Sequence, residues 1–168
     1  FITMDLGRPL HVFDADKIGN NLNMRLSNDQ EKLLALDNKE YSLNDITTVI
    51  ADNKNPLAIA GIIGGNDSGC TLETKNVFLE VAVFNPSMVA KTGRKLGINS
   101  DARYRFERGL DLEMVNEGLD YATNLINEIC RGSFSKKVHA GKLDLNQNTI
   151  SYKFDTFEKT IGIELSEK

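Results

Sequence analysis

One carboxylate stands in the middle of an otherwise apolar stretch of the chain. Glu80 lies within the run Val77–Phe84, whose other residues are all apolar, and such a run predicts a strand that is buried on both faces. Because alternate residues of a strand share a face, Glu80 is expected to point the same way as Phe78 and Phe84. A charged group in such surroundings is costly unless something pairs with it. We therefore interpret Glu80 as a polar contact inside an aromatic-lined pocket.

Purely structural roles stay open for Glu80 and for the histidine at position 11. An arginine of the segment 103–108 could neutralise Glu80 in a buried ion pair, since structural pairs also perturb carboxylates. His11 is flanked by apolar residues, and a histidine in that setting is more often a core residue with satisfied hydrogen bonds than a catalyst.

A glycine-rich segment, Gly61–Gly65, precedes the strand that carries Glu80. Its spacing fits neither a phosphate-binding P-loop nor a dinucleotide fingerprint. The segment is either a strand that ends in a tight turn or a place where missing side chains let a substrate approach the backbone. The chain has no Gly-x-Ser-x-Gly elbow, and its two histidines make a weak case for a catalytic triad.

The composition fits one soluble globular domain of ordinary size. The chain has 168 residues, of which 40% are hydrophobic and 26% charged, and no apolar run is long enough to cross a bilayer. Cys70 and Cys130 are the only cysteines, too few for a disulfide framework, so a cytoplasmic location is expected. Neither has a metal-ligand spacing, so no metal site is predicted. Because the chain opens mid-pattern at Phe1, we expect a piece excised from a larger protein.

The charges are distributed unevenly along the chain. The formal net charge is −4, which argues against a strongly basic surface for binding nucleic acid. One stretch is basic nevertheless: its cations are Lys91, Arg94, Lys95, Arg103, Arg105 and Arg108, against Asp101 and Glu107 as its acids. This stretch is either a binding surface or a solvated helix face with local ion pairs, and the charges alone favour the helix face.

The first half of the chain is predicted to be β-structure and the second half helical. Strand-like runs occur at 23–26, 32–36, 41–43 and 48–51, and a continuous apolar run at 57–63 ends at the glycines. Asn85 and Pro86 suit the start of a helix that ends at Gly97. Helical patterns follow at 102–108 and 112–130. Strands first and helices later argue for a single compact α+β domain with mixed or antiparallel sheets and helices packed on one side.

The end of the chain is expected to belong to a different module. Residues 138–148 are polar and unpatterned, which predicts a linker. Residues 149–154 are predicted to form a strand, and Asp155 with Glu158 a capping box that opens a helix. We therefore expect a domain over residues 1–145, followed at 149–168 by the truncated start of another module.

Several motifs of the chain, taken in order, resemble a single family. They are Leu6–Asp14, Gly61–Gly65 with Ser68 and Gly69, Thr74–Glu80, Asn85–Pro86, Arg94–Gly97, Ser100–Ala102 and Arg105–Asp111. Together they resemble the editing domain of the bacterial phenylalanyl-tRNA synthetase β subunit, from residue 1 to about residue 144. Residues from Thr149 onward resemble the beginning of the next β-subunit module.

The resemblance implies an activity and partners. The implied activity is hydrolysis of tyrosine wrongly attached to the phenylalanine tRNA, with the acceptor end of tRNA(Phe) as partner. The family's parent enzyme is an α2β2 tetramer that uses ATP and Mg²⁺, but its aminoacylation site lies on the α subunit, so no cofactor is expected in this chain. A site that hydrogen-bonds the phenol rejects phenylalanine strongly, because phenylalanine leaves a buried polar group unpaired.

The resemblance also assigns roles to single residues. Glu80 matches the residue that recognises the tyrosine phenol by a charge-assisted hydrogen bond. His11 corresponds to a pocket histidine near the scissile ester, where it would orient water or the ribose hydroxyls. Gly64 lies where the family has a pocket glycine, beside amides that would stabilise the oxyanion, and Gly61 is a second candidate.

Two further positions complete the expected substrate-binding set. Ala102 matches the small residue that keeps the pocket open, and Ser100 stands where many members carry threonine. The expected mechanism is hydrolysis by a positioned water molecule without a covalent intermediate. Two other functions stay open: a non-catalytic tRNA-binding or scaffold module of the same synthetase, and a free-standing editing or amino-acid-binding protein. The helix expected after Asp155 is cut off by the end of the chain, which argues against a free-standing protein.

Overall fold

The computed structural model describes residues 1–142, 149–151 and 153–163. The chain divides by its internal contacts into two units, residues 1–137 and residues 138–168, and each is described by itself. The first unit contains every strand found in the described residues, together with four helices. The second contains one helix, α5 (Phe154–Ile161).

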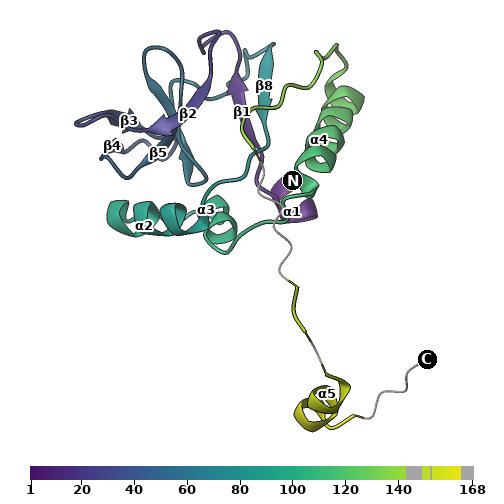
Figure 1. The fold of residues 1–168 in the computed structure, drawn as a ribbon. Coiled ribbons are helices and arrows are strands. Elements are labelled where there is room, and N and C mark those ends of the chain that lie inside the picture. The colour runs from purple at the N-terminus through teal and green to yellow at the C-terminus, as the bar shows by residue number, and fades with distance from the viewer. Residues whose placement is uncertain (143–148, 152, 164–168) are drawn as a thin grey trace. The chain divides into compact units, whose positions relative to one another are not determined.

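The strands of the first unit form three small sheets (Figure 1). β1 (His11–Asp14) pairs with β8 (Val77–Glu80), and β3 (Lys32–Leu34) pairs with β4 (Glu40–Ser42). The largest sheet contains, in spatial order, β2 (Asn23–Leu26), β5 (Thr48–Ala51), β6 (Pro56–Ile59) and β7 (Ile63–Gly64). All pairs among the described strands are antiparallel.

The helices follow the strands in the chain, apart from the short α1 (Ile2–Leu6). Figure 1 shows α2 (Pro86–Leu96) and α3 (Asp101–Phe106) along one end of the strands, with α4 (Met114–Cys130) beside β8. The predicted start of α2 is confirmed, since the Asn85 side chain accepts a hydrogen bond from the Met88 N–H at 3.2 Å. Its predicted end is confirmed as well, because Gly97 adopts a left-handed conformation with φ 67°.

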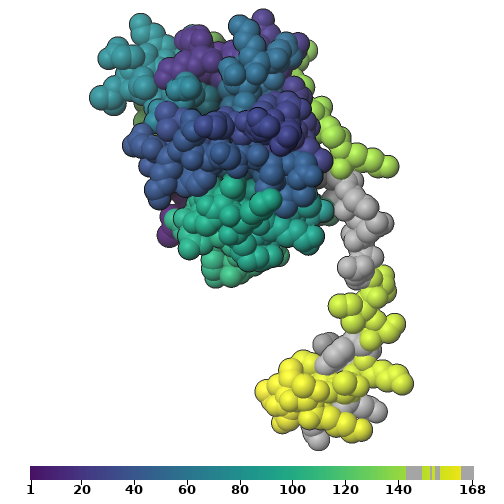
Figure 2. Space-filling view, turned by 90° about the vertical axis from the view of Figure 1, so that its left-hand side faces the viewer, coloured from purple at the N-terminus to yellow at the C-terminus, as the bar shows by residue number. Residues whose placement is uncertain are grey.

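One core joins the strands to the helices of the first unit. Phe13, Val49 and Ile59 are almost inaccessible to solvent, and the same cluster includes Val89 of α2 and Phe106 of α3. Figure 2 shows the segment that carries α2 and α3 packed directly against the strands from the first half of the chain. The predicted α+β class with antiparallel sheets is therefore confirmed.

The strand that carries Glu80 differs from its prediction. β8 ends at Glu80, and Val77 and Phe78 remain 42% and 43% exposed, so the expectation of burial on both faces is wrong. The physical reason is that β8 pairs only with β1, which leaves its outer end uncovered. Phe84 lies beyond the strand yet is buried, so it reaches the core through the irregular segment that follows β8.

The apolar run 57–63 is not one strand. It contains β6, a turn and β7, with Gly61 in the turn at φ 69°. Apolar side chains continue through the turn because it is buried. The apolar pattern therefore gives no sign that the chain reverses direction there. The strands expected at 23–26 and 48–51 are confirmed. The strand expected at 32–36 begins as predicted but ends two residues earlier, and the strand expected at 41–43 begins and ends one residue earlier.

The predictions for the second unit are confirmed in part: the expected helix is present as α5, whereas the strand expected before it is not. Residues 149–151 and 153 are not in a strand, and among the described residues of this unit no strand is present to pair with them. The helix begins at Phe154, after Lys153 as its N-cap, so Asp155 lies inside the helix and the capping-box prediction is wrong. Most of the predicted linker, residues 143–148, and Tyr152 lie outside the described residues.

Candidate functional site

A pocket of about 230 Å³ lies between the β1–β8 pair, the β6–β7 hairpin and α3. We call it the His11–Glu80 pocket. It is lined by Pro9, Leu10, His11, Leu36, Ile50, Ala58, Ile59, Ala60, Gly61, Ile62, Ile63, Gly64, Glu80, Phe84, Ala102 and Phe106. Since a cavity of about 150 Å³ holds benzene, this space is large enough for a phenol ring.

Five of the six site residues predicted from the sequence line this one pocket: His11, Gly61, Gly64, Glu80 and Ala102. They come from β1, β8, α3 and the β6–β7 hairpin, which are far apart in the chain. The sixth, Ser100, is not among the lining residues. The fold therefore brings together what the motifs could give only in sequence order.

The register of one strand pair places the histidine beside the acid. His11 and Glu80 are Cα partners in the antiparallel β1–β8 pair, and directly opposed side chains lie on one face within contact distance. Buried Asp14 fixes the far end of β1, because it accepts a hydrogen bond from the Thr74 hydroxyl at 2.6 Å. This hydrogen bond also lowers the pKa of Asp14, so the carboxylate stays ionised.

The Glu80 carboxyl has no hydrogen-bond or ion-pair partner within the described part of the chain. The nearby arginines bind other acids: Arg103 contacts Glu107 at 3.0 Å, Arg105 contacts Asp101 at 3.6 Å and Arg108 contacts Glu107 at 2.9 Å. The alternative of a buried structural ion pair is therefore wrong. Although the residue keeps some solvent access, burial raises the pKa of the Glu80 carboxyl to about 7.

His11 also has an unpaired polar atom. Its Nε2 is buried and has no hydrogen-bond partner among the described residues, so the alternative of a satisfied core histidine does not hold. The ring packs edge-on against Phe13, with 4.3 Å between centroids. Burial lowers the His11 pKa below its usual value, which keeps the imidazole neutral at pH 7 and leaves one ring nitrogen able to accept a proton or a hydrogen bond.

The two pocket glycines are needed for different reasons. A Cβ on Gly64 would lie 2.3 Å from Cε1 of His11, so the missing side chain makes room for the imidazole. Gly61 has φ 69°, and its Cβ would lie 2.8 Å from Cδ2 of Phe84. The interpretation of the segment as a strand that ends in a tight turn is therefore confirmed. The close approach of a substrate to its backbone stays a prediction.

Ser100 acts at a distance from the pocket. Its hydroxyl accepts a hydrogen bond from the Arg103 N–H at 3.0 Å and donates one to the Ile62 carbonyl at 2.6 Å. The side chain thus caps α3 and ties that helix to the β6–β7 hairpin. Through this link Ser100 positions Ala102, which does line the pocket.

Part of the pocket wall was not predicted from the sequence. Leu10, Leu36 and Phe106 line the pocket, and no pattern distinguished the two leucines from ordinary core or surface residues. Phe106 packs against Phe84 with 4.9 Å between ring centroids and 60° between ring planes. Only the aromatic character of Phe106, one helical turn after Ala102, was a usable signal.

Buried Arg8 anchors the segment that leads into the pocket. Its guanidinium donates hydrogen bonds to the Ala82 carbonyl at 3.2 Å and to the Asp111 carbonyl. Burial lowers the Arg8 pKa from its usual value. The contacts join the chain before Pro9 to the segment after β8, and so brace the two strands that supply His11 and Glu80.

The described residues contain no group of three or more His, Cys, Asp or Glu side chains that could hold a metal ion. Nor is any of their helices both long and apolar enough to cross a membrane.

Comparison with known proteins points to one family. The B3/4 domain matches residues 1–131. The chain is 47% identical over 167 residues to the phenylalanine–tRNA ligase beta subunit of Bradyrhizobium diazoefficiens, covering 99% of the chain and 21% of that protein. The subunit of the same name from the Wolbachia of Brugia malayi is 46% identical over 159 residues, covering 95% of the chain and 20% of that protein.

A solved structure shares the fold. An N-terminal fragment of the phenylalanyl-tRNA synthetase β-subunit from Pyrococcus horikoshii aligns with a TM-score of 0.54 and 20% identity, covering 99% of this chain and 50% of that one. The chain spans about a fifth of the length of the curated relatives that it matches. Because the family model matches residues 1–131 of the 168, the chain belongs to the B3/4 domain family, and it is similar to one region of phenylalanine–tRNA ligase beta subunits.

Proposed function

We propose that the His11–Glu80 pocket hydrolyses tyrosine esterified to the phenylalanine tRNA, as the editing site of a phenylalanine–tRNA ligase. One observation carries the proposal: a buried carboxyl group without a protein partner lies inside a pocket lined by Phe84 and Phe106 and large enough for a phenol ring. The relatives' name, phenylalanine–tRNA ligase beta subunit, supports the choice of tRNA.

Glu80 selects the tyrosine side chain. The phenol O–H donates a hydrogen bond to the Glu80 carboxylate, and a charge-assisted bond of this kind is about twice as strong as a neutral one. A phenylalanine ring fits the same walls but leaves the acid unpaired in a poorly hydrated site. That penalty is the source of the discrimination, because an apolar pocket alone separates the two amino acids poorly.

His11 acts at the ester. Its neutral imidazole offers an unpaired Nε2, which accepts a hydrogen bond from the attacking water or from a ribose hydroxyl and holds it in position. Neighbouring amides are partly in use, since the Ile62 N–H donates to Ile59 and the Gly65 N–H to Leu57. The oxyanion role is therefore assigned to the backbone at Gly64.

The proposal places the other parts of the reaction outside this chain. The tRNA acceptor end and an α subunit in an α2β2 tetramer are the proposed partners, and aminoacylation with ATP and Mg²⁺ is proposed for the α subunit. Each step assigned to this chain uses its own side chains, the backbone at Gly64 and one water molecule.

The selection step is tested by deacylation of Tyr-tRNA(Phe) and Phe-tRNA(Phe), with the chain alone and within the full tetramer. Glu80→Gln should lower kcat/KM for Tyr-tRNA(Phe) about tenfold or more, because the charge-assisted bond is lost. Glu80→Ala should lower it further. Glu73→Gln, which changes an exposed glutamate, is the matched control and should leave hydrolysis unchanged. Equal discrimination in all four proteins would refute the role of Glu80.

The role of His11 is tested separately. His11→Ala should slow hydrolysis of Tyr-tRNA(Phe) about a hundredfold, as expected when a positioning or general-base group is lost. Binding of tyrosinamide should change little, since Glu80 and the aromatic walls remain. A normal rate of hydrolysis in this variant would remove His11 from the mechanism.

A scaffold or binding role without chemistry is the second candidate. Lys91, Arg94 and Lys95 are exposed on α2, and no acid within the described residues pairs with them, so they offer a surface to phosphate groups. Titration with tyrosine and phenylalanine separates the two candidates. Selective binding of tyrosine supports editing, whereas binding of neither amino acid supports the scaffold.

A further inference from the structure

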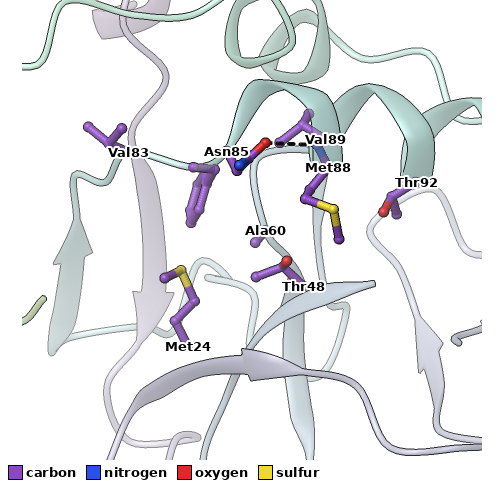
Figure 3. Close-up of a pocket in the computed structure, with 9 residues that line it drawn as sticks. Met24, Thr48, Ala60, Val83, Asn85, Met88, Val89 and Thr92 are labelled. Carbon is purple, nitrogen blue, oxygen red and sulfur yellow. Dashed lines mark hydrogen bonds between the residues drawn. The ribbon is translucent and has the colours of Figure 1, made fainter. Parts of the chain in front are cut away.

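A second cavity lies behind the wall of the His11–Glu80 pocket. It has a volume of about 110 Å³, and its lining includes Met24, Thr48, Ala60, Phe84, Met88 and Thr92. We call it the rear cavity (Figure 3). Strands β2 and β5 form one side of it and α2 the other. Met24 is 59% exposed, so the opening to solvent lies beside a flexible side chain.

The rear cavity contains a hydroxyl group without a partner. Thr92 is 3% exposed, and its Oγ1 has no hydrogen bond to any described residue. A threonine within a helix usually donates to the carbonyl four residues earlier, and Thr123 of α4 does so to Leu119 at 2.7 Å. Figure 3 shows the Thr92 oxygen turned toward the space between the lining residues. A buried unpaired hydroxyl is unfavourable, so this group is suited to a ligand.

The lining defines the chemistry of that ligand. No ionisable side chain lines the cavity, so a charged molecule would lose its hydration without compensation. The thioethers of Met24 and Met88 adapt their shape to apolar groups. Figure 3 shows the Thr48 oxygen directed into the same space from the opposite side. By comparison with the cavity of about 150 Å³ that holds the six heavy atoms of benzene, 110 Å³ takes about four to five heavy atoms.

The rear cavity and the His11–Glu80 pocket share part of their walls. Ala60 and Phe84 line both. Phe84 packs against Phe106 on the pocket side, so a molecule in the rear cavity would support the other side of its ring. A change in the position or mobility of the Phe84 ring would then alter binding in the His11–Glu80 pocket. By the same coupling, binding in the His11–Glu80 pocket would alter the affinity of the rear cavity equally.

We propose that the rear cavity is a second binding site, for a small uncharged molecule with one hydroxyl group, whose occupancy is communicated to the His11–Glu80 pocket through Phe84. Only the consequence for hydrolysis rests on the proposed function. The binding itself is a property of the rear cavity.

The test uses the methionines of this chain as reporters. With ¹³C-methyl methionine, tert-butanol should produce saturable shifts at Met24 and Met88 with a dissociation constant of about 1 mM, within the ceiling for so small a ligand. Met4 and Met114 do not line the cavity and should not shift. The aromatic signals of Phe84 should shift with the same dissociation constant.

Matched variants locate the hydrogen bond. Thr92→Val keeps the shape and should weaken tert-butanol binding about fivefold, the effect of one hydrogen bond, whereas Thr92→Ser should retain it. Thr123→Val makes the same change in another helix, where the hydroxyl is already paired, and should have no effect. Equal binding in Thr92→Val, unsaturable shifts, or an unmoved Phe84 would each overturn the proposal.

The outcome is separable from that of the proposed function. Failure of Tyr-tRNA(Phe) hydrolysis would leave the methyl shifts unaffected, and absence of the shifts in a protein that hydrolyses Tyr-tRNA(Phe) would refute only the rear cavity. If both hold, saturating tert-butanol should change the affinity for tyrosinamide about twofold or more in the original protein, and less in Thr92→Val.

Discussion

At the scale of single residues, the pocket contains two ionisable groups that burial shifts in opposite directions. The pKa of Glu80 rises to about 7, and the pKa of His11 falls below its usual value. Each shift favours the neutral form of its group. The two residues are strand partners, yet they form no ion pair among the described contacts. Near pH 7 the Glu80 carboxyl is therefore divided between its neutral and its ionised form. A phenol that donates to the carboxylate would shift this balance toward the ionised form.

This arrangement predicts how stability depends on pH. Between pH 4.5 and about 7 the folded chain keeps a proton on Glu80 that the unfolded chain has lost. The native state binds more protons in this window, so its free energy of unfolding should fall as the pH rises, by up to about 1.4 kcal/mol per pH unit. In Glu80→Gln this contribution is absent. Denaturant unfolding at pH 5, 6, 7 and 8 should therefore show the variant gaining stability relative to the original chain.

The control for the pH experiment is Glu73→Gln. Glu73 is exposed, so its variant should follow the original chain at every pH. A stability difference between Glu80→Gln and the original chain that stays constant from pH 5 to pH 8 would show that burial does not shift Glu80.

At the scale of elements, Gly61 and Gly97 form a matched pair. Both adopt left-handed conformations, with φ 69° and φ 67°, but a Cβ meets Phe84 at Gly61 and nothing within 4 Å at Gly97. Gly97→Ala should cost about 1 kcal/mol of unfolding free energy, from backbone conformation alone. Gly61→Ala should cost at least about 1 kcal/mol more, because it also displaces the wall of the pocket. Equal losses of unfolding free energy in the two variants, measured by urea unfolding, would show that the Phe84 side chain moves aside without an energetic cost.

The elements also show what the sequence could and could not predict. The capping residue Asn85 and the stop at Gly97 act locally, so α2 could be located closely. The reversal at Gly61 was hidden because its neighbours remain apolar, and β1 was missed because its four residues show no alternation of polar and apolar side chains. The meeting of His11 with Glu80 depends on pairing between segments nearly 70 residues apart, which no local pattern contains.

At the scale of the whole molecule, the uneven charge predicts weak binding of nucleic acid. The net charge is −4, and the arginines of α3 are occupied by Asp101 and Glu107. Three cations of α2 remain for phosphate contacts, so the chain alone should bind tRNA with a dissociation constant of about 100 µM at physiological salt, in the non-specific range. The logarithmic salt slope should correspond to about three phosphates.

Filter-binding at several salt concentrations tests this expectation. Replacing Lys91, Arg94 and Lys95 together by alanine should abolish most of the binding. The same replacement of Lys32, Lys39 and Lys54, which are also exposed but lie in the strand region, should have little effect. Tight binding by the original chain would mean that a surface other than α2 holds the tRNA.

The register of the β1–β8 pair determines which side chains of the two strands face the pocket. Because side chains alternate along a strand, sliding β1 by a single residue would turn His11 away and present Val12 in its place. The pocket would keep Glu80 and its aromatic rings but lose the imidazole. Under the proposed function it would still select a phenol but could no longer hold the attacking water in position. Asp14 and Thr74 do not line the pocket, yet their hydrogen bond holds the alignment of β1 that directs His11 into it.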